Sequence, residues 1–365
     1  MKKEERLDKV SESTRIKNED SLENINEKVL QVFRKISPDG YAQWTYSLLE
    51  KTIKDKFSIT VSSTLIRHIL IDEIGAAHVY RIAGHSFQIS IDATDDVFLR
   101  LSHYQLFNDT TKRSNKSLFH LHITKLSKEF LNNTKSIALA QKKGKGNMWY
   151  LNDDKLCFVY PKMDGTPSMV LSIGKDFCNG TLAVEKNANP ELLLQSIVRM
   201  YSMRTNALKT LILHAVVVEY KGLGYIFIGN CRTGKTTHSH LWVDNIPGAK
   251  YFNDDRPVIR IHPDGSAWVY GTPWAGDSPV YRNEKLPIGG IVQLAQAPFN
   301  KIRSVPKLEA YTNLLPRIQN ALIVEQAESL KRTIIELISA VPSWHLDCLP
   351  NKEAAILCCN TIVKR

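Results

Sequence analysis

The sequence has few cysteines, and their spacing suits neither a metal site nor a disulfide framework. The six cysteines are Cys157, Cys178, Cys231, Cys348, Cys358 and Cys359. Because no C-x-x-C pair occurs among them, neither a zinc site nor a network of disulfides is expected. No apolar run approaches the ~20 residues that a membrane-spanning helix needs, and the charged segment 1–6 is not followed by an apolar core. We therefore expect a cytoplasmic protein that makes no use of a membrane.

Length and charge narrow the range of partners. The chain of 365 residues suits a core of ~250 to 300 residues with an appendage. Hydrophobic residues make up 43% and charged residues 23% of it, which is the composition of an ordinary globular protein. The formal net charge of +11 favours anionic partners. A nucleotide and a nucleic acid both meet this condition, and charge alone does not choose between them.

A glycine-bounded phosphate loop is the most informative motif. The pattern G-x-x-x-x-G-K-[ST] is formed by Gly229, Asn230, Cys231, Arg232, Thr233, Gly234, Lys235 and Thr236, and Thr237 follows. The apolar run 225–228 before it predicts a strand, and the segment after it predicts a helix, which is the context that this motif requires. Backbone N–H groups of such a loop surround a polyphosphate, the lysine contacts the β and γ phosphates, and the threonine hydroxyl ligates Mg²⁺. ATP with Mg²⁺ is therefore the expected ligand.

Two adjacent carboxylates follow the loop. Asp254 and Asp255 come at the end of the aromatic stretch 251–253 and shortly before Pro257. A hard cation that bridges phosphates needs oxygen ligands of this kind, and a hydroxyl that accepts a phosphoryl group needs a base nearby. Both carboxylates are therefore candidate Mg²⁺ ligands. The alternative is that they only form a polar turn before the proline.

Residues 1–75 predict a charged tail and a small helical module. Apolar residues recur at helical spacing from about 25 to 75, with breaks at 37–40 and 58–61. The segments 40–45 and 62–67 resemble the winged-helix segment at the front of some bacterial transposases. This resemblance implies a helix-turn-helix within residues 40–75, with Ser63, Thr64, Arg67 and His68 facing the major groove of DNA. The alternative is a module that docks on the core or on a neighbouring subunit of a homo-oligomer.

Between residues 78 and 186 the apolar pattern alternates with a period of two. The predicted strands are 78–82, 87–91, 118–123, 148–151, 157–160, 169–173 and 181–184. Most connections between them are too short for crossovers, so we expect a mostly antiparallel sheet. His120 and His122 share one side of a strand, but without a third ligand nearby an ordinary strand face is favoured over a metal site.

The remainder of the chain predicts an α/β core. The expected elements are helix 187–206, strands 211–218 and 225–229, a hairpin of 258–261 with 267–270, strand 289–294, a helical stretch 307–341 broken at Pro316, strand 344–346 and helix 351–364.

Four landmarks carry a resemblance to a known family. They are Leu213-His214, in which the histidine precedes Gly229 by fifteen residues (229 − 214 = 15), the loop 233–237, the segment 253–257 and the loop 271–276. On these residues the chain from about 77 onward resembles the HPr kinase/phosphorylase-related proteins of the phosphoenolpyruvate carboxykinase-like superfamily. The resemblance implies a mixed, curved α/β sheet and a catalytic domain at 76–365, in which a β-rich part (76–210) precedes the nucleotide-binding core (211–365).

The same resemblance implies roles for the site residues. Asp254 would take the proton from an acceptor hydroxyl, and Lys235 would neutralise charge on the phosphates. Asp255 and Thr236 would hold Mg²⁺. His214 would lie near the phosphates, either bonded to the aspartate pair or polarising the acceptor. A buried structural histidine is the alternative for His214.

Arg256 is a further candidate catalytic residue, Trp274 and Arg303 are weaker candidates, and the family pattern is not complete. Arg256 either stabilises the transferring charge or pairs with its neighbouring carboxylates, and Trp274 and Arg303 would line the acceptor pocket. HPr kinases usually carry Gly-Lys-Ser where this chain has Gly-Lys-Thr-Thr, and their glycine-rich second signature is not recognisable here. HPr itself is therefore doubtful as the acceptor, and decarboxylation is the less favoured chemistry.

The sequence predicts a kinase that transfers the γ-phosphoryl group of ATP to a hydroxyl, with serine, free or within a peptide or protein, as the best acceptor. A competing hypothesis is a regulator that binds DNA through residues 40–75 and senses nucleotide through its core. A third is a scaffold whose core binds ATP without transferring phosphate.

Overall fold

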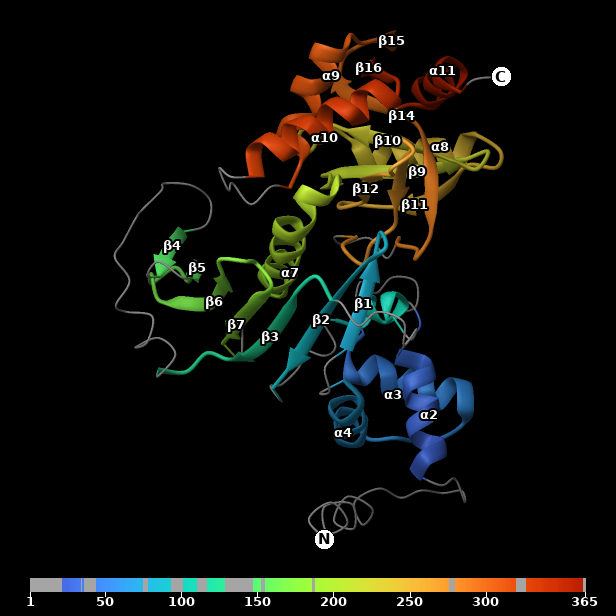
Figure 1. Ribbon diagram of the computed structural model, residues 1–365. Helices are drawn as coiled ribbons and strands as arrows, with labels where there is room; N and C mark the ends of the chain where they lie inside the picture. Colours follow the sequence, from blue (N-terminus) through green and yellow to red (C-terminus); the bar gives the residue numbers. More distant parts are fainter. Residues whose placement is uncertain are drawn as a thin grey trace. The chain divides into compact units, whose positions relative to one another are not determined.

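The computed structural model describes residues 22–33, 35, 44–74, 78–92, 101–109, 117–128, 147–151, 155–185, 188–275, 280–319 and 326–363. The chain divides into two compact units, both drawn in Figure 1. The first unit consists of Met1–Tyr80, Phe87–Asn115 and His120–Leu192. The second consists of Arg81–Ser86, Lys116–Phe119 and Leu193–Arg365.

The first unit contains the helical module that the sequence predicts. Its helices are α2 (Leu22–Phe33), α3 (Tyr46–Phe57) and α4 (Ser63–Ile74). Helix α3 begins at Tyr46 because the Thr45 hydroxyl accepts a hydrogen bond from the backbone N–H of Leu48, at 3.1 Å, and so caps the first turn. The helix ends at Ser58, whose backbone is left-handed. The prediction of helices between residues 25 and 75 is confirmed, whereas residues 36–43 and the tail 1–21 lie outside the described residues.

The sheet of the first unit is mixed. Its strands are β1 (His78–Ile82), β2 (His85–Ile91), β3 (His120–Lys125), β4 (Asn147–Leu151), β5 (Lys155–Pro161), β6 (Pro167–Gly174) and β7 (Asn179–Val184), and a 3-10 helix, η1, spans Ser102–Phe107. The strand order is β1-β2-β3-β7-β6-β5-β4. From β4 to β7 the neighbours are antiparallel, but β3 runs parallel to both β2 and β7. The expected antiparallel arrangement is wrong around β3, because the long connection from β2 to β3 leaves room for a crossover.

The second unit is built on another mixed sheet. Its strands are β8 (Thr210–Ile212), β9 (Ala215–Tyr220), β10 (Leu223–Ile228), β11 (Lys250–Asn253), β12 (Val258–Ile261), β13 (Ala267–Tyr270), β14 (Lys285–Gln296), β15 (Lys301–Ser304) and β16 (Ser343–Cys348). Its helical elements are α7 (Pro190–Thr205), whose first turn belongs to the first unit, η2 (Asn206–Leu208), α8 (Lys235–Asn245), α9 (Lys307–Leu314), η3 (Leu315–Arg317), α10 (Ala327–Ala340) and α11 (Lys352–Ile362).

The long strand β14 joins the two halves of this sheet. Its first residues pair antiparallel with β13, and the rest pairs parallel with β10 on one side and β16 on the other. The complete order is β11-β9-β10-β14-β13-β12-β8, with β16 beside β14 and β15 beside β16. The α/β class with a mixed sheet is therefore confirmed for the described part of the chain.

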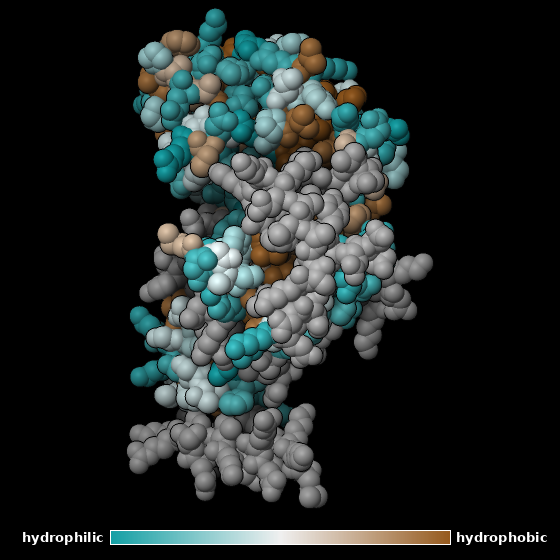
Figure 2. All heavy atoms as spheres, turned by 90° about the vertical axis from the view of Figure 1, so that its left-hand side faces the viewer, coloured by the Kyte–Doolittle hydropathy of each residue, from teal (hydrophilic) through white to brown (hydrophobic). Residues whose placement is uncertain are grey.

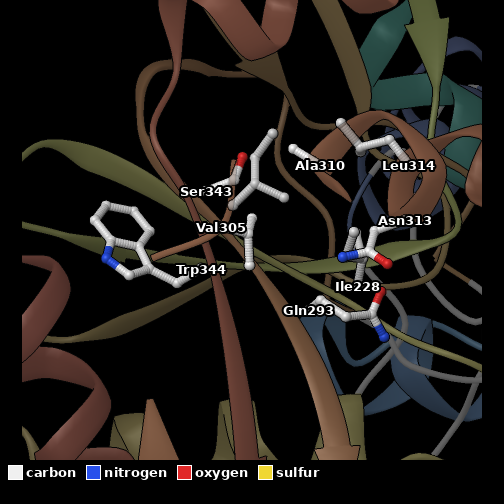
Figure 3. Close-up of a pocket in the computed structure, with 9 residues that line it drawn as sticks. Ile228, Gln293, Val305, Ala310, Asn313, Leu314, Ser343 and Trp344 are labelled. Atoms are coloured by element: carbon white, nitrogen blue, oxygen red, sulfur yellow. The ribbon is translucent and has the colours of Figure 1, made fainter. Parts of the chain in front are cut away.

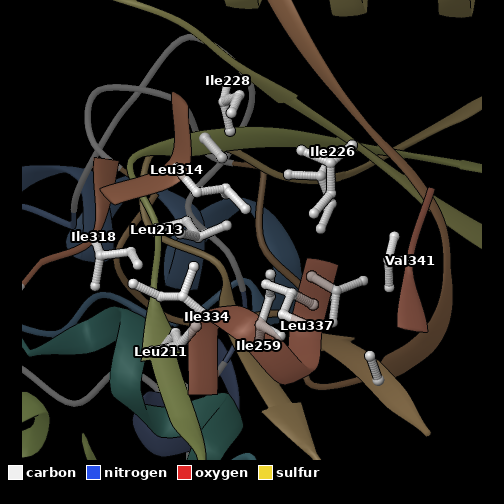
Figure 4. Close-up of a cluster of buried hydrophobic side chains, with 14 of the residues drawn as sticks. Leu211, Leu213, Ile226, Ile228, Ile259, Leu314, Ile318, Ile334, Leu337 and Val341 are labelled. Atoms are coloured by element: carbon white, nitrogen blue, oxygen red, sulfur yellow. The ribbon is translucent and has the colours of Figure 1, made fainter. Parts of the chain in front are cut away.

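Two apolar clusters hold helices against this sheet. In the first, helices α9 and α10 pack on side chains of β8 to β14, as Figure 4 shows for Ile226, Ile259, Ile334 and Leu337. In the second, α8 and α11 pack on the side chains of β10, β14 and β16, with the indole of Trp242 fully buried. Burial of each large side chain contributes ~1.5 to 3 kcal/mol, so both helix layers are firmly attached. The connection between β10 and α8 is the phosphate loop.

Two elements differ from the expectation. The predicted strand 211–218 is interrupted at Leu213-His214, because β8 pairs with β12 whereas β9 pairs with β10 and β11. The change of partner takes His214 out of a regular strand. The helical stretch 307–341 is present as α9, η3 and α10, and residues 320–325 between them lie outside the described residues.

Apolar side chains at the surface are scattered. Phe299, Leu308 and Ile335 are the most exposed large apolar residues of the second unit. Among the residues that are coloured in Figure 2, hydrophilic ones predominate, with smaller apolar areas between them. Within the described ranges, none of the helices combines the length and apolar character needed to cross a bilayer.

Candidate functional site

The loop between β10 and α8 contains two residues with a left-handed backbone. Gly234 has φ 96° and Arg232 has φ 65°, and Gly234 immediately precedes α8. The N–H and the hydroxyl of Thr233 donate to the carbonyl of Asn230 at 3.2 and 2.5 Å and close the turn. A Cβ atom at Gly229 would lie 3.1 Å from the Thr233 hydroxyl and 3.3 Å from the carbonyl of Leu294. Glycine at both ends therefore permits this close fold of the loop.

Lys235 is buried at the start of α8 and its ammonium group turns back into the loop. Nζ donates to the carbonyls of Gly229 and Asn230 at 3.4 and 3.2 Å. It also lies 3.1 Å from Nε2 of His214. The ammonium thus occupies the concave side of the loop, where the phosphates of a nucleotide are bound in sites of this type.

His214 connects this lysine to the aspartate pair. Its Nδ1 lies 2.9 Å from Oδ1 of Asp255, and Nε of Arg256 lies 3.4 Å from the other oxygen of the same carboxylate. The Asp255 and Arg256 side chains are only 19% and 14% exposed, whereas the His214 side chain is 45% exposed and accessible to a ligand. The four groups of Lys235, His214, Asp255 and Arg256 form one continuous polar chain.

This chain determines the tautomer of His214. An ammonium group can only donate, so Nε2 must accept the bond from Lys235 with its lone pair. The proton of the neutral ring is then on Nδ1, from which it is donated to Asp255. His214 is therefore held in the orientation in which it accepts a charge-assisted hydrogen bond from the lysine.

Asp254 lies beside this chain but is less engaged. Its Oδ1 accepts a hydrogen bond of 2.8 Å from the backbone N–H of Asp255. The buried amide of Asn253 donates to the carbonyl of Asp254 at 2.7 Å and accepts from the backbone N–H of Thr272 at 2.6 Å. Asn253 thus fixes the backbone on which both carboxylates stand, and Asp255 itself has a left-handed backbone with φ 67°.

The pKa values of the two carboxylates are shifted in opposite directions. Burial raises the pKa of Asp254, and the negative charge of Asp255 raises it further. Burial alone would also raise the pKa of Asp255, but the hydrogen bond from His214 and the charge of Arg256 outweigh it and lower that pKa. A pair with separated pKa values allows one group to exchange protons while the other keeps its charge.

The oxygen groups of the site are of the kind that hold a cation jointly with a bound ligand. Within the described ranges, no cluster of three or more His, Cys, Asp or Glu side chains is placed to hold a metal ion. Mg²⁺ commonly takes one or two carboxylates and completes its shell with phosphates and water. Thr236 and Thr237 are exposed in the first turn of α8, and the carboxylates of Asp254 and Asp255 would offer oxygen ligands. These residues fit a Mg²⁺ ion that arrives with a nucleotide.

Two residues of this site were missed by sequence reasoning. Asn253 could have been found, because it directly precedes the aspartate pair. Arg317 follows a proline at a helix break and carries no motif. The fold alone brings its guanidinium to the loop, where NH2 donates to Oδ1 of Asn230 at 2.5 Å.

Two weaker candidates have other contacts in the structure. The indole of Trp274 is fully buried and packs edge-on against Tyr201, at 5.1 Å between ring centroids, so it cannot line an open acceptor pocket. Arg303 is occupied by two hydrogen bonds of 2.9 and 2.6 Å to Glu309. Residues 276–279 of the loop that follows Trp274 lie outside the described residues.

The paired histidines of the first unit lie on the same side of β3, as predicted. Ser90 Oγ lies 2.7 Å from Nε2 of His120 and 3.0 Å from Nδ1 of His122. His122 Nε2 lies 3.0 Å from Asp92, a carboxylate that also accepts from Thr124. These groups satisfy one another across neighbouring strands, which is the ordinary strand face that the sequence favours.

A small pocket is lined by residues of β10, β14, α9 and β16. Figure 3 shows its lining, which includes Ile228 at the end of β10, Gln293 of β14 and Asn313 of α9. Its empty volume is about 180 Å³. Because none of the predicted site residues lines it, this pocket is separate from the phosphate loop.

Comparison with known proteins adds no relative. No model of a known protein family matches the chain, and no curated protein matches its sequence.

Proposed function

We propose that this chain is an ATP- and Mg²⁺-dependent phosphotransferase that acts on a hydroxyl group, with serine, free or within a peptide or protein, as the acceptor. The observation that carries the proposal is the convergence of the Lys235 ammonium and the Asp255 carboxylate on the same imidazole of His214. Residues from the phosphate loop and from the segment after β11 meet there, as phosphoryl transfer between a nucleotide and an acceptor requires.

In the proposed reaction the acceptor oxygen forms a bond to the γ-phosphorus as the bond to the β–γ bridging oxygen breaks. The proton of the acceptor hydroxyl passes to Asp254, and ADP leaves. Lys235 neutralises phosphate charge, and Asp255 and Thr236 would hold the Mg²⁺ that accompanies ATP. His214 keeps the side chains of Lys235 and Asp255 in position through its contacts with both. Catalysis consists mainly of positioning and charge neutralisation.

The raised pKa of Asp254 supports its role as the base, because a more basic carboxylate accepts a proton more readily near neutral pH. Compared with Asp254, Asp255 is better suited to remain ionised, since its pKa is lowered and its two oxygens contact His214 and Arg256. Arg256 pairs with Asp255, and this pairing favours a structural role over direct contact with the phosphoryl group.

The kind of fold is compatible with the proposed kinship to HPr kinase-related and carboxykinase-like proteins. A mixed sheet with a phosphate loop between β10 and α8, followed by a carboxylate pair after β11, is the arrangement that this resemblance implies. The assignment to that superfamily is part of the proposal.

The direct test uses purified protein, Mg²⁺ and ATP labelled at the γ-phosphate. We expect transfer of label to free serine, to a serine peptide or to a protein serine, and no transfer when EDTA removes Mg²⁺. ATP binding without a phosphorylated product from any hydroxyl acceptor would instead support a nucleotide-binding scaffold.

A second candidate function is DNA binding by the helical module. Helix α4 exposes Thr64, Arg67 and His68, which are residues of the kind that contact bases and phosphates. Ser63 at its start is engaged with Glu50 of α3, at 2.5 Å, so it is a structural residue rather than a free contact. A nucleotide-sensing regulator would combine this helix with the core.

Fluorescence anisotropy with a labelled DNA duplex at two salt concentrations distinguishes the candidates. If α4 binds DNA, Arg67→Ala is expected to weaken binding and to reduce the dependence of log K on log salt by about one. Lys331→Ala, which removes an exposed charge from α10, is the matched control and should leave binding unchanged. No binding by the wild-type chain at low salt would exclude this function.

A further inference from the structure

Arg317 contacts the phosphate loop, although no sequence motif includes it. It ends η3, and its guanidinium donates from NH2 to the Asn230 side chain at 2.5 Å. Its backbone is fixed in the same place, because its carbonyl accepts the backbone N–H of His214 at 2.7 Å. The next residue, Ile318, forms a β-bridge with Leu213. Arg317 is therefore held beside both the loop and the histidine.

The charge of Arg317 is not compensated within the described residues. No carboxylate of the described chain pairs with its guanidinium, and its Nε atom is buried there without a hydrogen-bond partner. Lys235 Nζ donates to the carbonyl of Asn230 at 3.2 Å, and Arg317 NH2 donates to the side chain of the same residue at 2.5 Å. Two cations held on one residue of the loop favour an anion between them.

We propose that Arg317 contacts the γ-phosphate of bound ATP, exchanging its bond to the neutral amide of Asn230 for bonds to phosphate oxygens. This inference rests on the proposed function and adds a residue to it. A guanidinium presents several donors in one plane, so NH2 and the unpartnered Nε can both donate to a single phosphoryl group. Contact with that group distinguishes ATP from ADP.

Arg317 also links the nucleotide to the histidine. The carbonyl of Arg317 accepts the backbone N–H of His214, so the segment that carries Arg317 also holds His214 in place. His214 in turn contacts Lys235 and Asp255. Arg317 is accordingly assigned a direct contact with the transferring group, not only the support of Asn230.

The test compares affinities for Mg²⁺-AMPPNP and Mg²⁺-ADP by isothermal titration calorimetry. The wild-type chain is expected to prefer the triphosphate, and Arg317→Gln to lose roughly 10- to 150-fold of that preference while its ADP affinity changes little. Arg317→Lys should keep part of it. Asn230→Ala, which removes the tether but keeps the charge, should retain it. Arg332→Gln, on the exposed face of α10, is the matched control and should behave as wild type.

A second measurement needs no variant. In the wild-type chain, AMPPNP should protect Arg317 from phenylglyoxal, as read by peptide mapping, and ADP should protect it much less. Equal loss of both affinities in Arg317→Gln, or equal protection by both nucleotides, would show that Arg317 only supports the loop and would overturn this inference alone. Failure of the wild-type chain to bind either nucleotide would remove the proposed function as well.

Discussion

Lys235→Ala is expected to abolish ATP-dependent phosphoryl transfer and to weaken nucleotide binding strongly. The ammonium is buried and donates to two loop carbonyls and to His214, so its removal takes a positive charge from the interior of the loop. Loss of one partner of a desolvated, charge-assisted contact costs about 2 to 5 kcal/mol, or roughly 30- to 5,000-fold. Transfer is measured with labelled ATP and binding by calorimetry.

Thermal unfolding provides a check on the same variant that does not depend on the acceptor. ATP at 100 times the wild-type Kd should stabilise the wild-type chain by about 2.7 kcal/mol, and the same ATP concentration should stabilise Lys235→Ala by about 0.9 kcal/mol or less. Lys250→Ala, in which an exposed lysine of β11 is removed, controls for the loss of positive charge. Full ATP-dependent activity in Lys235→Ala would place the nucleotide elsewhere and invalidate the site.

Asp254→Asn is expected to slow transfer by about 10²- to 10⁴-fold while sparing nucleotide affinity, because the amide cannot take the proton of the acceptor. The pH profile gives a second signature. A base acts in its ionised form, so the rate of the wild-type enzyme should fall as the pH drops through the raised pKa of Asp254. The decline should therefore begin at a higher pH than an ordinary aspartate would give.

The residual activity of Asp254→Asn should lack this acid limb. Asp244→Asn, at an exposed position of α8, is the control and should keep both the rate and the pH profile. Unchanged transfer by Asp254→Asn would assign the base to another group, and an equal loss of nucleotide affinity would make Asp254 a ligand of the metal–nucleotide complex rather than a base.

Local pattern predicted most of the elements of the core, because each carries its own periodicity and turn signals. The strand before the phosphate loop, the helix after it and the hairpin of β12 and β13 are present close to their predicted bounds. The parallel pairing of β3 was not predictable in the same way. Strand direction depends on which distant strands become neighbours, and a period of two is identical in parallel and antiparallel sheets.

In the candidate site, too, some residues were predictable from local sequence and others were not. Lys235 and Asp255 were identified by motif and chemistry, and the structure places both against His214. Arg317 and the burial of Trp274 depend on long-range packing, which no local pattern encodes. A tryptophan between glycines suggests an exposed loop, yet its large apolar surface drives it into the interior against Tyr201.

The left-handed backbone at Asp255 and Arg232 has an evolutionary consequence. Glycine enters that conformation freely, whereas another residue gives up on the order of 1 kcal/mol there. Laboratory evolution under heat challenge alone should therefore drift to glycine at Arg232, whose side chain is exposed. At Asp255 the carboxylate should be retained even without selection for turnover, because glycine there would remove the largely buried ion-pair partner of His214 and Arg256.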